Sequence, residues 1–338
     1  MEGSTRHHRR DPGYGLHRVA AKYGTAVVGH RGTGGSEALR LRALRSVADR
    51  VRDEFPALTV NADAEKSLSV ASVLVEASRH EAHRRQVRLR LVLAVPSPHD
   101  TERVVDDTAL HNAVRRASSE ALDEAAVWAR ERHPGTELAT VLRDGYPAPV
   151  LCATSRHTRM VVLGSRHLTR PGEIFSGCSV VLPVAAQAHC PVVVVAGSEG
   201  TAKGPAHLVV GVDGSEASKT AMGLAFQEAA LRGCELHAIS VWQPPVFSFR
   251  NETAVVGAQR RMLAETAAGW AHEYSDVKFT HEVLTGHPVE RLAEAAEHAL
   301  ALVVGRRGRG GYTGIRIGSV AHGLLHRAHR PVITVPGG

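Results

Sequence analysis

The chain has 338 residues and a formal net charge of +7, with 43% hydrophobic but only 4% aromatic residues. At roughly 100–200 residues per domain, this length predicts two domains. No apolar run is long enough to span a membrane and no signal peptide is recognisable, while none of the four cysteines stands in a CxxC pair. We therefore expect a reduced, cytoplasmic protein without a zinc knuckle or a redox motif.

The excess of positive charge does not indicate a nucleic-acid partner. Arginine is spread along the whole chain, and no compact basic run is interleaved with aromatic residues, as a stacking surface for bases would require. General basic composition explains the charge better.

Residues 1–57 form an N-terminal extension that fits neither of the two repeats that follow. Met1–Asp11 is basic and polar and is predicted to be disordered. Thr25–Gly35 is predicted to be a strand followed by a glycine-rich turn, and Leu39–Val51 a helix. Two interpretations stay open: the remnant of another strand, glycine-loop and helix unit, or an unrelated appendage that adds a strand.

The rest of the chain contains an internal repeat. Three motifs occur twice in the same order, and the members of each pair are 140 or 141 positions apart. The pairs are Gly145-Tyr-Pro with Gly286-His-Pro, Val161-Val-Leu-Gly-Ser-Arg with Leu302-Val-Val-Gly-Arg-Arg, and Cys190-Pro-Val-Val-Val-Val with Arg330-Pro-Val-Ile-Thr-Val. This period is too long for a solenoid unit, so we predict two tandem domains, at 58–197 and 205–338.

Apolar strands alternate with helical patterns in both repeats. In the first repeat we predict a strand near Leu58–Ala62, a helix at Val70–Arg85 and a strand at Leu89–Val95. In the second repeat the predicted elements are strands at His207–Val212, Leu236–Val241, Lys278–Leu284, Leu302–Val304 and Val332–Val335, and helices at Ser218–Arg232, Val255–His272, Pro288–Ala299 and Ser319–His329. This alternation is typical of a mostly parallel sheet covered on both faces. We therefore expect an α/β protein with two tandem, open, Rossmann-like sheets of five strands, which bind ligands beyond the carboxyl ends of the strands.

A glycine loop of pattern G-x2-G-x9-G-S runs from Gly305 to Ser319, between a predicted strand and a predicted helix. Glycine lets the backbone approach a ligand without a Cβ in the way, and the N–H groups at a helix start favour anionic oxygens. The Ser319 hydroxyl is expected to cap the helix or to donate to a phosphate. The loop is neither a Walker A loop nor a GxGxxG turn, and taken alone it also fits a flexible surface loop.

Two flanking motifs give the loop a context. Val209-Val-Gly-Val-Asp-Gly-Ser215 precedes it on the first strand, and Pro331-Val-Ile-Thr-Val335 closes the repeat. Over 205–336 this combination strongly resembles the universal stress protein family. The resemblance implies an adenine nucleotide alpha-hydrolase-like fold, binding of ATP with or without Mg²⁺, and dimerisation, either as a homodimer or as an intramolecular pseudo-dimer of the two domains.

The resemblance also implies where the nucleotide lies. The residues carried over by position are Asp213 at the adenosine end, Val241 against the adenine, Gly305 and Gly308 below the ribose and phosphates, and Gly318, Ser319 and Val320 around the phosphates.

The first repeat departs from this pattern. Its loop begins at Gly164 and keeps Gly177, but His167 replaces the second glycine and Cys178 replaces the serine. Asn61-Ala-Asp-Ala64 is its nearest counterpart of the Asp213 motif. A histidine obstructs close approach of the backbone, and a thiol is a weak donor. We predict that the first domain keeps the fold and has lost most or all nucleotide binding.

Other residues are weaker candidates for a functional role. The loop arginines at 306, 307 and 309 either contact phosphate oxygens directly or only add a positive field, and both interpretations stay open. His322, His326 and His329 recur at helical spacing, which favours a packed or solvated face over a metal site. Nothing marks Ser215 as an activated nucleophile, and no catalytic residue is predicted.

The leading hypothesis is thus an ATP-binding module that senses nucleotide and acts through conformation or a regulatory partner in a stress response. One alternative is a slow ATPase or autophosphorylating protein that uses the same loop. Because no general base is visible, we expect weak ATP hydrolysis at most. A second alternative is a dimerisation module of the same fold that binds no nucleotide.

Overall fold

The computed structural model describes residues 25–26, 82, 85, 87–95, 108–132, 135, 137–164, 180–195, 205–244, 252–309 and 316–337. The predictions for Met1–Asp11, Leu39–Val51, Leu58–Ala62 and most of Val70–Arg85 lie outside these residues. Among the helices of the described part, none combines the length and the apolar character that a membrane crossing requires.

The second domain is built on five parallel strands, and its α/β fold confirms the sequence prediction. The strands are β6 (His207–Gly211), β7 (Glu235–Trp242), β8 (Phe279–Thr285), β9 (Ala301–Gly305) and β10 (Val332–Val335). Their order in the sheet is β10-β9-β6-β7-β8. β6, β9 and β10 are almost entirely buried, as expected for parallel strands covered on both faces. The order reverses at β6, which has β7 on one side and β9 on the other.

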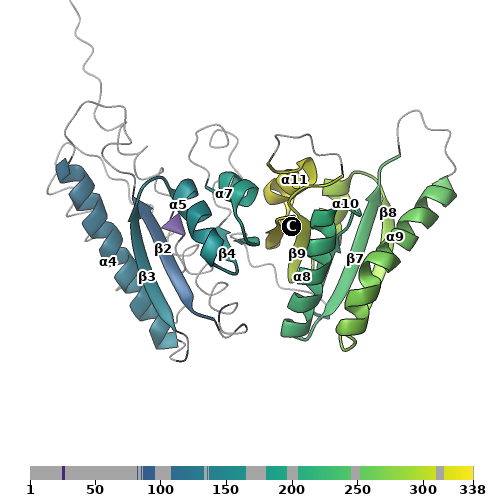
Figure 1. Cartoon of the computed structure of the whole chain (residues 1–338), viewed down its shortest axis with the longest axis horizontal. Coiled ribbons are helices and arrows are strands. Elements are labelled where there is room, and N and C mark those ends of the chain that lie inside the picture. Colours follow the sequence, from purple (N-terminus) through teal and green to yellow (C-terminus); the bar gives the residue numbers. More distant parts are fainter. Residues whose placement is uncertain are drawn as a thin grey trace, which may run out of the picture.

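Four helices cover this sheet, two on each face (Figure 1). α8 (Glu216–Arg232) and α9 (Glu252–Glu273) contribute Phe226 and Leu263 to one core cluster. α10 (Pro288–Ala295) and α11 (Ser319–Arg327) contribute Leu292 and Leu324 to the other. The predicted Rossmann-like, three-layer arrangement is therefore present.

Several helix boundaries differ from the predictions: α9 begins three residues early and ends one residue late, and three other differences have a local cause. α8 begins two residues early, because Ser215 is its N-cap and accepts a hydrogen bond from the Ser218 N–H. α10 ends at Ala295 rather than Ala299, since the chain then continues in tighter i→i+3 turns. α11 ends at Arg327 rather than His329, because Ala328 is already extended and Pro331 cannot prolong a helix.

The described elements of the first domain correspond to those that follow α8 in the second domain, and its described strands lie in two separate sheets. The elements are β2 (Leu89–Val95), α4 (Thr108–Arg132), β3 (Leu138–Asp144), α5 (Pro147–Thr154), the 3-10 turn η2 (Ser155–His157), β4 (Val161–Gly164), α7 (Val181–Gln187) and β5 (Val192–Val195). β2 pairs in parallel with β3, and β4 with β5. β1 (Thr25–Ala26), from the N-terminal extension, adds an antiparallel strand beside β2.

The two domains join edge to edge. β5 pairs antiparallel with β10, which makes one seven-stranded sheet of order β4-β5-β10-β9-β6-β7-β8. The pairing is centred on Val193 and Ile333, which are equivalent residues of the repeat. Such self-matching is the mark of an approximate two-fold axis, and the two halves form the arms of a V in Figure 1. One core cluster also runs across this seam, from Val184 of α7 to Leu324 of α11.

A buried carboxylate adds a polar link between the domains. Glu228 of α8 is fully buried and forms an ion pair with Arg232, one turn further along the helix. Its other carboxylate oxygen pairs with Arg85 of the first domain. A buried charge is tolerated only when it is paired, so these two guanidinium groups stabilise Glu228 from both sides of the seam.

Candidate functional site

The candidate site lies where the strand order reverses. β6 ends at Gly211 and leads through Asp213 and Gly214 into α8, while its neighbour β9 ends at Gly305 and leads into the glycine loop. The structure describes both stems of this loop, up to Arg309 and from Arg316. Open parallel sheets bind ligands at such a point, beyond the carboxyl ends of the strands.

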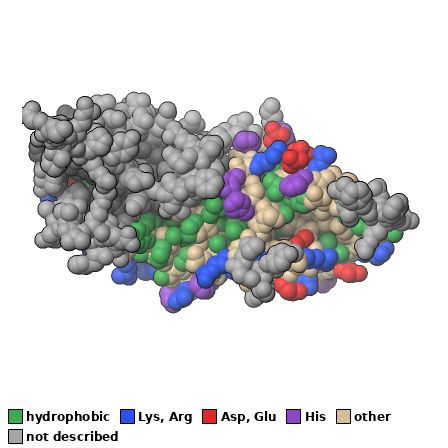
Figure 2. Space-filling model, turned by 90° about the horizontal axis from the view of Figure 1, so that it is seen from above, with side chains coloured by type: hydrophobic (Ala, Val, Ile, Leu, Met, Phe, Trp, Pro, Cys, Tyr) green, Lys and Arg blue, Asp and Glu red, His purple; other side chains and the backbone are tan. Residues whose placement is uncertain are grey.

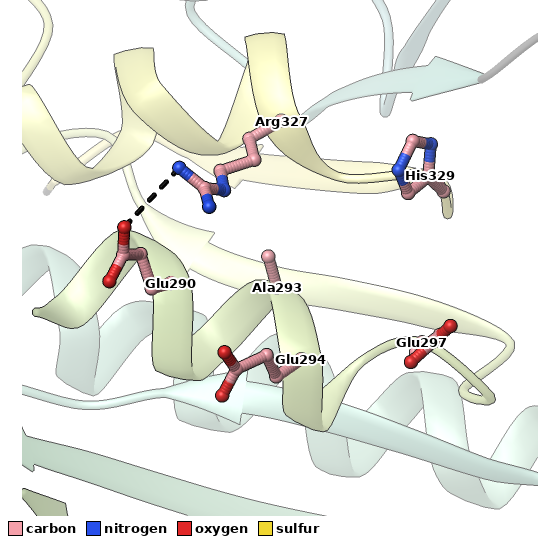
Figure 3. A pocket seen from close by; sticks show the side chains of 6 residues that line it. All are labelled: Glu290, Ala293, Glu294, Glu297, Arg327 and His329. Carbon is pink, nitrogen blue, oxygen red and sulfur yellow. Dashed lines mark ion pairs between the residues drawn. The ribbon is translucent and has the colours of Figure 1, made fainter. Parts of the chain in front are cut away.

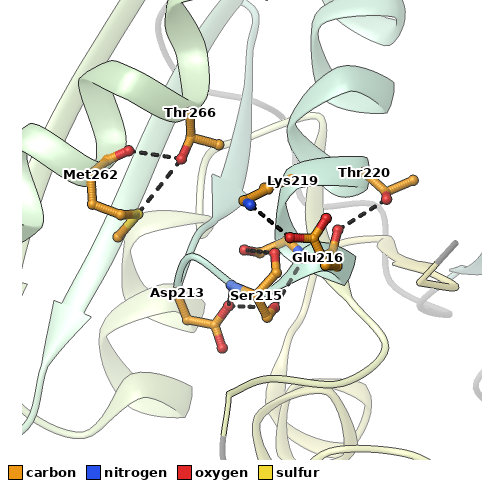
Figure 4. Close-up of polar contacts among 8 residues, drawn as sticks. Asp213, Ser215, Glu216, Lys219, Thr220, Met262 and Thr266 are labelled. Carbon is orange, nitrogen blue, oxygen red and sulfur yellow. Dashed lines mark hydrogen bonds and ion pairs between the residues drawn. The ribbon is translucent and has the colours of Figure 1, made fainter.

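The Asp213 carboxylate is held by three backbone and side-chain donors. Its Oδ1 accepts hydrogen bonds from the Ser215 hydroxyl at 2.6 Å and the Ser215 N–H at 3.0 Å. Its Oδ2 accepts one from the Arg309 N–H, across the loop, at 3.0 Å. Figure 4 shows Asp213 and Ser215 together at the start of α8. Asp213 therefore links the first βα turn of the domain to the glycine loop.

These contacts decide the charge of Asp213. Burial alone raises the pKa of the Asp213 carboxyl, but hydrogen bonds from Ser215, Arg309 and Ser218 lower it by more. The pKa of Asp213 is thus below its usual range, and the group is an anion at neutral pH. A carboxylate of this kind is an acceptor and a weak base.

At two positions of the loop, close contacts leave no room for a side chain larger than that of glycine. A Cβ at Gly308 would lie 2.5 Å from Asp213 Oδ2, so a side chain there would separate the loop from the carboxylate. A Cβ at Gly305 would lie 2.8 Å from the backbone carbon of Ala217 and 2.9 Å from the Ser218 nitrogen in α8. The sequence predicted close backbone approach of a ligand at both positions, and the neighbours that the structure places there are Asp213 and the start of α8.

The start of α11 differs from the prediction for Ser319. The N-cap is Gly318, which has no side chain to cap the helix, and Ser319 is the exposed first helical residue. The first intrahelical hydrogen bond runs from the His322 N–H to the Gly318 carbonyl. The N–H groups of Ser319, Val320 and Ala321 have no acceptor within the helix, and the Ser319 hydroxyl does not replace one. This helix start is therefore suited to an anionic ligand.

Apolar side chains from the predicted site pack against the core cluster on the face of the sheet that α10 and α11 cover. Val241, near the end of β7, and Val320 are half-buried and pack at the margin of the same hydrophobic cluster. Val289 and Ile317 share this margin. Val289 and Ile317 are not among the residues predicted from the sequence. The position of Ile317, an apolar residue just before Gly318, is the feature that could have indicated it.

The three loop arginines have different roles. The Arg306 guanidinium donates to the Ala188 carbonyl of the first domain at 2.7 Å, which argues against a phosphate contact by that group. The Arg307 Nε donates within the loop to the Arg316 carbonyl at 3.4 Å. A Cβ at Gly214, which has a φ of +79°, would collide with the Arg309 guanidinium. Arg309 therefore lies over the Asp213-Gly214 turn.

A second concavity lies at the opposite end of α11. It has a volume of about 190 Å³ and is lined by Glu290, Ala293, Glu294, Glu297, Arg327 and His329. In Figure 3 the Arg327 side chain reaches across to Glu290, at 3.4 Å. This volume is below the roughly 300 Å³ of small ligand sites, and three carboxylates would repel phosphate, so this concavity does not suit a nucleotide.

Only two of the three histidines that the sequence placed on one helix face belong to α11. The His322 and His326 rings lie 4.8 Å apart, and burial followed by repulsion from His326 lowers the pKa of His322. His329 follows the helix and lines the second concavity. Among the described residues no group of three potential metal ligands comes together. On the face that Figure 2 presents, positive, negative and histidine side chains are interspersed over the described part of the surface.

The fold defines the class of the protein: two tandem open-sheet α/β domains, joined through their last strands. The sequence model of the universal stress protein family matches residues 63–196 and 206–336. The chain belongs to this family.

Relatives with two such domains match most of the chain. A universal stress protein of Mycolicibacterium smegmatis is 33% identical over 282 residues, which cover 82% of this chain and 95% of the relative. Universal stress protein Rv1996 of Mycobacterium tuberculosis is 32% identical over 288 residues, covering 77% and 89%. The solved structure of a universal stress protein from Archaeoglobus fulgidus has a TM-score of 0.58 at 18% identity, covering 82% of this chain and 94% of its own, and supports the fold.

Proposed function

We propose that the second domain binds ATP between Asp213 and the start of α11, and that the protein acts as a nucleotide-sensing regulatory module of the stress response in the cytoplasm. The observation that carries the proposal is the closure of the loop onto Asp213 through Gly308, where no side chain fits. The same loop ends at helix N–H groups that suit phosphate oxygens.

Each part of the nucleotide has a chemically matched region. The Asp213 carboxylate is an acceptor for hydroxyl or amino groups of the adenosine, and the half-buried Val241 and Val320 offer an apolar border to the base. Gly305 and Gly308 keep the loop backbone close, and Gly318 with the Ser319 and Val320 N–H groups faces the phosphates. Mg²⁺ would reach the site with the phosphates.

Binding is favoured over hydrolysis by the state of Asp213. A general base works best when its pKa is near the operating pH, whereas the pKa of Asp213 is lowered and its oxygens already accept three hydrogen bonds. We therefore expect ATP to be recovered intact.

The test is the nucleotide released from the purified protein, identified by mass spectrometry. Wild type is expected to carry about one ATP per chain, and Gly308→His, which copies His167 of the first domain, is expected to carry none. Gly269→His is the matched control, because a Cβ at Gly269 on α9 meets no atom within 4 Å. Equal nucleotide content in wild type and Gly308→His would reject this site.

A further inference from the structure

Two arginines connect the stems of the glycine loop to the other domain. Arg306 follows Gly305, and its Nη1 donates to the Ala188 carbonyl at 2.7 Å. Arg316 precedes Gly318 by two residues, and its Nη1 donates to Gln187 Oε1 at 2.8 Å. Gln187 ends α7 and Ala188 is its C-cap. Both stems of the loop therefore contact the same helix end in the first domain.

The stems are also joined to each other. The Gly318 N–H donates to the Arg306 carbonyl at 2.8 Å, and the Arg306 N–H donates to the Val335 carbonyl of β10 at 2.7 Å. The Arg307 Nε adds a weaker contact to the Arg316 carbonyl. A displacement of either arginine is thus transmitted to Gly318, the residue that begins α11.

Electrostatics favours the contacts of Arg306 and Arg316 with the C-terminal end of α7. The last carbonyls of a helix lack intrahelical donors and carry partial negative charge. In the part of the chain that the structure describes, neither Arg306 nor Arg316 has a carboxylate partner, and the buried Arg306 Nε makes no hydrogen bond. The end of α7 therefore holds two cations beside the proposed phosphate site.

The sequence of the first repeat does not preserve the residues that make this contact. In the repeat, Ser165 stands where Arg306 stands, and Arg327 stands where Gln187 stands. Arg327 is paired with Glu290 of its own domain. The first repeat therefore has no arginine at the position of Arg306, and the end of α11 carries a cation where α7 offers an amide.

We propose that the end of α7 is a positioning element for the ATP loop, and we call Gln187 and Ala188 with Arg306 and Arg316 the α7 clamp. The inference rests on the proposed function of the second domain. By holding both stems in the ligand-free protein, the clamp reduces the ordering that ATP binding must supply. The domain whose own glycine loop is degenerate in sequence thus raises the affinity of its neighbour.

The decisive variant is Gln187→Ala, because the Gln187 side chain is exposed and its loss leaves the core intact. The Kd for ATP, measured by calorimetry, is expected to rise roughly three- to tenfold, as for loss of one exposed hydrogen bond of ordinary strength. Gln227→Ala, which removes an exposed amide from α8 far along the helix from Asp213, is the matched control and should leave the Kd unchanged.

A double-mutant cycle separates positioning from a general effect. Arg316→Ala is expected to weaken ATP binding like Gln187→Ala, and the double variant to bind no more weakly than either single one. In ligand-free protein, the amides around Gly318 should exchange hydrogen faster in Gln187→Ala than in wild type or Gln227→Ala.

The outcomes distinguish the two proposals. If wild type binds no ATP, the proposed function is rejected. If wild type binds ATP and Gln187→Ala binds it equally well, the α7 clamp is rejected. Fully additive effects of Gln187→Ala and Arg316→Ala would also reject it, because the two residues would then act independently.

Discussion

The two copies of the glycine loop share their first and last glycines but differ at the second, and the geometry of one copy explains why this difference matters. Gly164 and Gly305 are equivalent and both end a buried strand. Gly308, however, has His167 as its counterpart. Since a Cβ at Gly308 would already lie 2.5 Å from Asp213 Oδ2, the arrangement of the second copy has no room for an imidazole. A single Gly308→His substitution is therefore expected to exclude the close loop while leaving the strands unaffected.

The helices that follow the two loops, α7 and α11, also share their packing and differ in their surface contacts. Both pack on the same face of the joint sheet and contribute to one core cluster. Their last residues, Gln187 and Arg327, have different partners: Arg316 across the seam for Gln187, and Glu290 within the domain for Arg327. A duplicated framework has thus acquired different contacts at its surface.

The largest expected effect on stability concerns the joint between the copies. Arg85→Ala removes one of the two cations that contact the fully buried Glu228, and should lower the free energy of unfolding by roughly 3 kcal/mol. Denaturant unfolding measures the change. Arg88→Ala is the control, since Arg88 and Glu137 form an exposed pair, worth about 1 kcal/mol at most. Equal losses would mean that Glu228 does not link the domains.

The next largest effect is expected at Gly305, and the equivalent Gly164 provides the comparison. Gly305→Ala places a methyl group against the backbone of α8, and overpacking of this kind costs about 2 kcal/mol. The variant is expected to lose both stability and bound ATP. Gly164→Ala, at the equivalent position, should leave the ATP content of the purified protein unchanged. Loss of ATP in Gly164→Ala would assign nucleotide binding to the first copy as well.

The pH dependence of stability tests the contacts of Asp213. Because the folded pKa of Asp213 is lowered, its stabilising contribution is complete above the unfolded value of about 3.9. That contribution is lost as the pH falls through the lower, folded pKa. The free energy of unfolding in urea should therefore be higher for wild type than for Asp213→Asn at neutral pH. This difference should shrink as the pH is lowered. A difference that stays constant down to pH 3 would contradict this account.

The smallest effect on stability is expected at Gly318. A Cβ there would meet only contacts of 3.4 Å or more, and the backbone φ of −73° suits any residue. Gly318→Ala should therefore change the free energy of unfolding by no more than about 0.5 kcal/mol. A lower affinity for ATP in this stable variant would report close approach of the ligand. An unchanged affinity would remove Gly318 from the site.

The sequence predicted local features well where the chain itself marks the boundary. β2 and β10 match their predicted ranges, and Pro331 sets the start of β10 by ending the preceding segment. The close approaches at Gly305 and Gly308 also follow from glycine chemistry. The cap at Ser215 was missed because the predicted helix began at Ser218, and Ser319 was given a capping role that Gly318 has.

The contacts across the seam could not be predicted from local patterns. The hydrogen bond from Arg306 to Ala188 joins residues more than 100 positions apart and exists only because β5 pairs with β10. From sequence, Arg306 was one of three similar loop arginines. Its partner depends on the register of two strands, which the repeat suggests but does not determine.

The antiparallel pairing of β5 and β10 has a consequence for assembly. In a pair of separate chains, such a contact would weaken on dilution. Here both partners belong to one polypeptide, and residues 196–206 connect the domain that ends in β5 to the domain that ends in β10. The effective concentration of one edge at the other is set by this connection and not by expression level. The joint sheet, and the support it gives to the loop after β9, should therefore be equally complete at the lowest and the highest abundance of the protein.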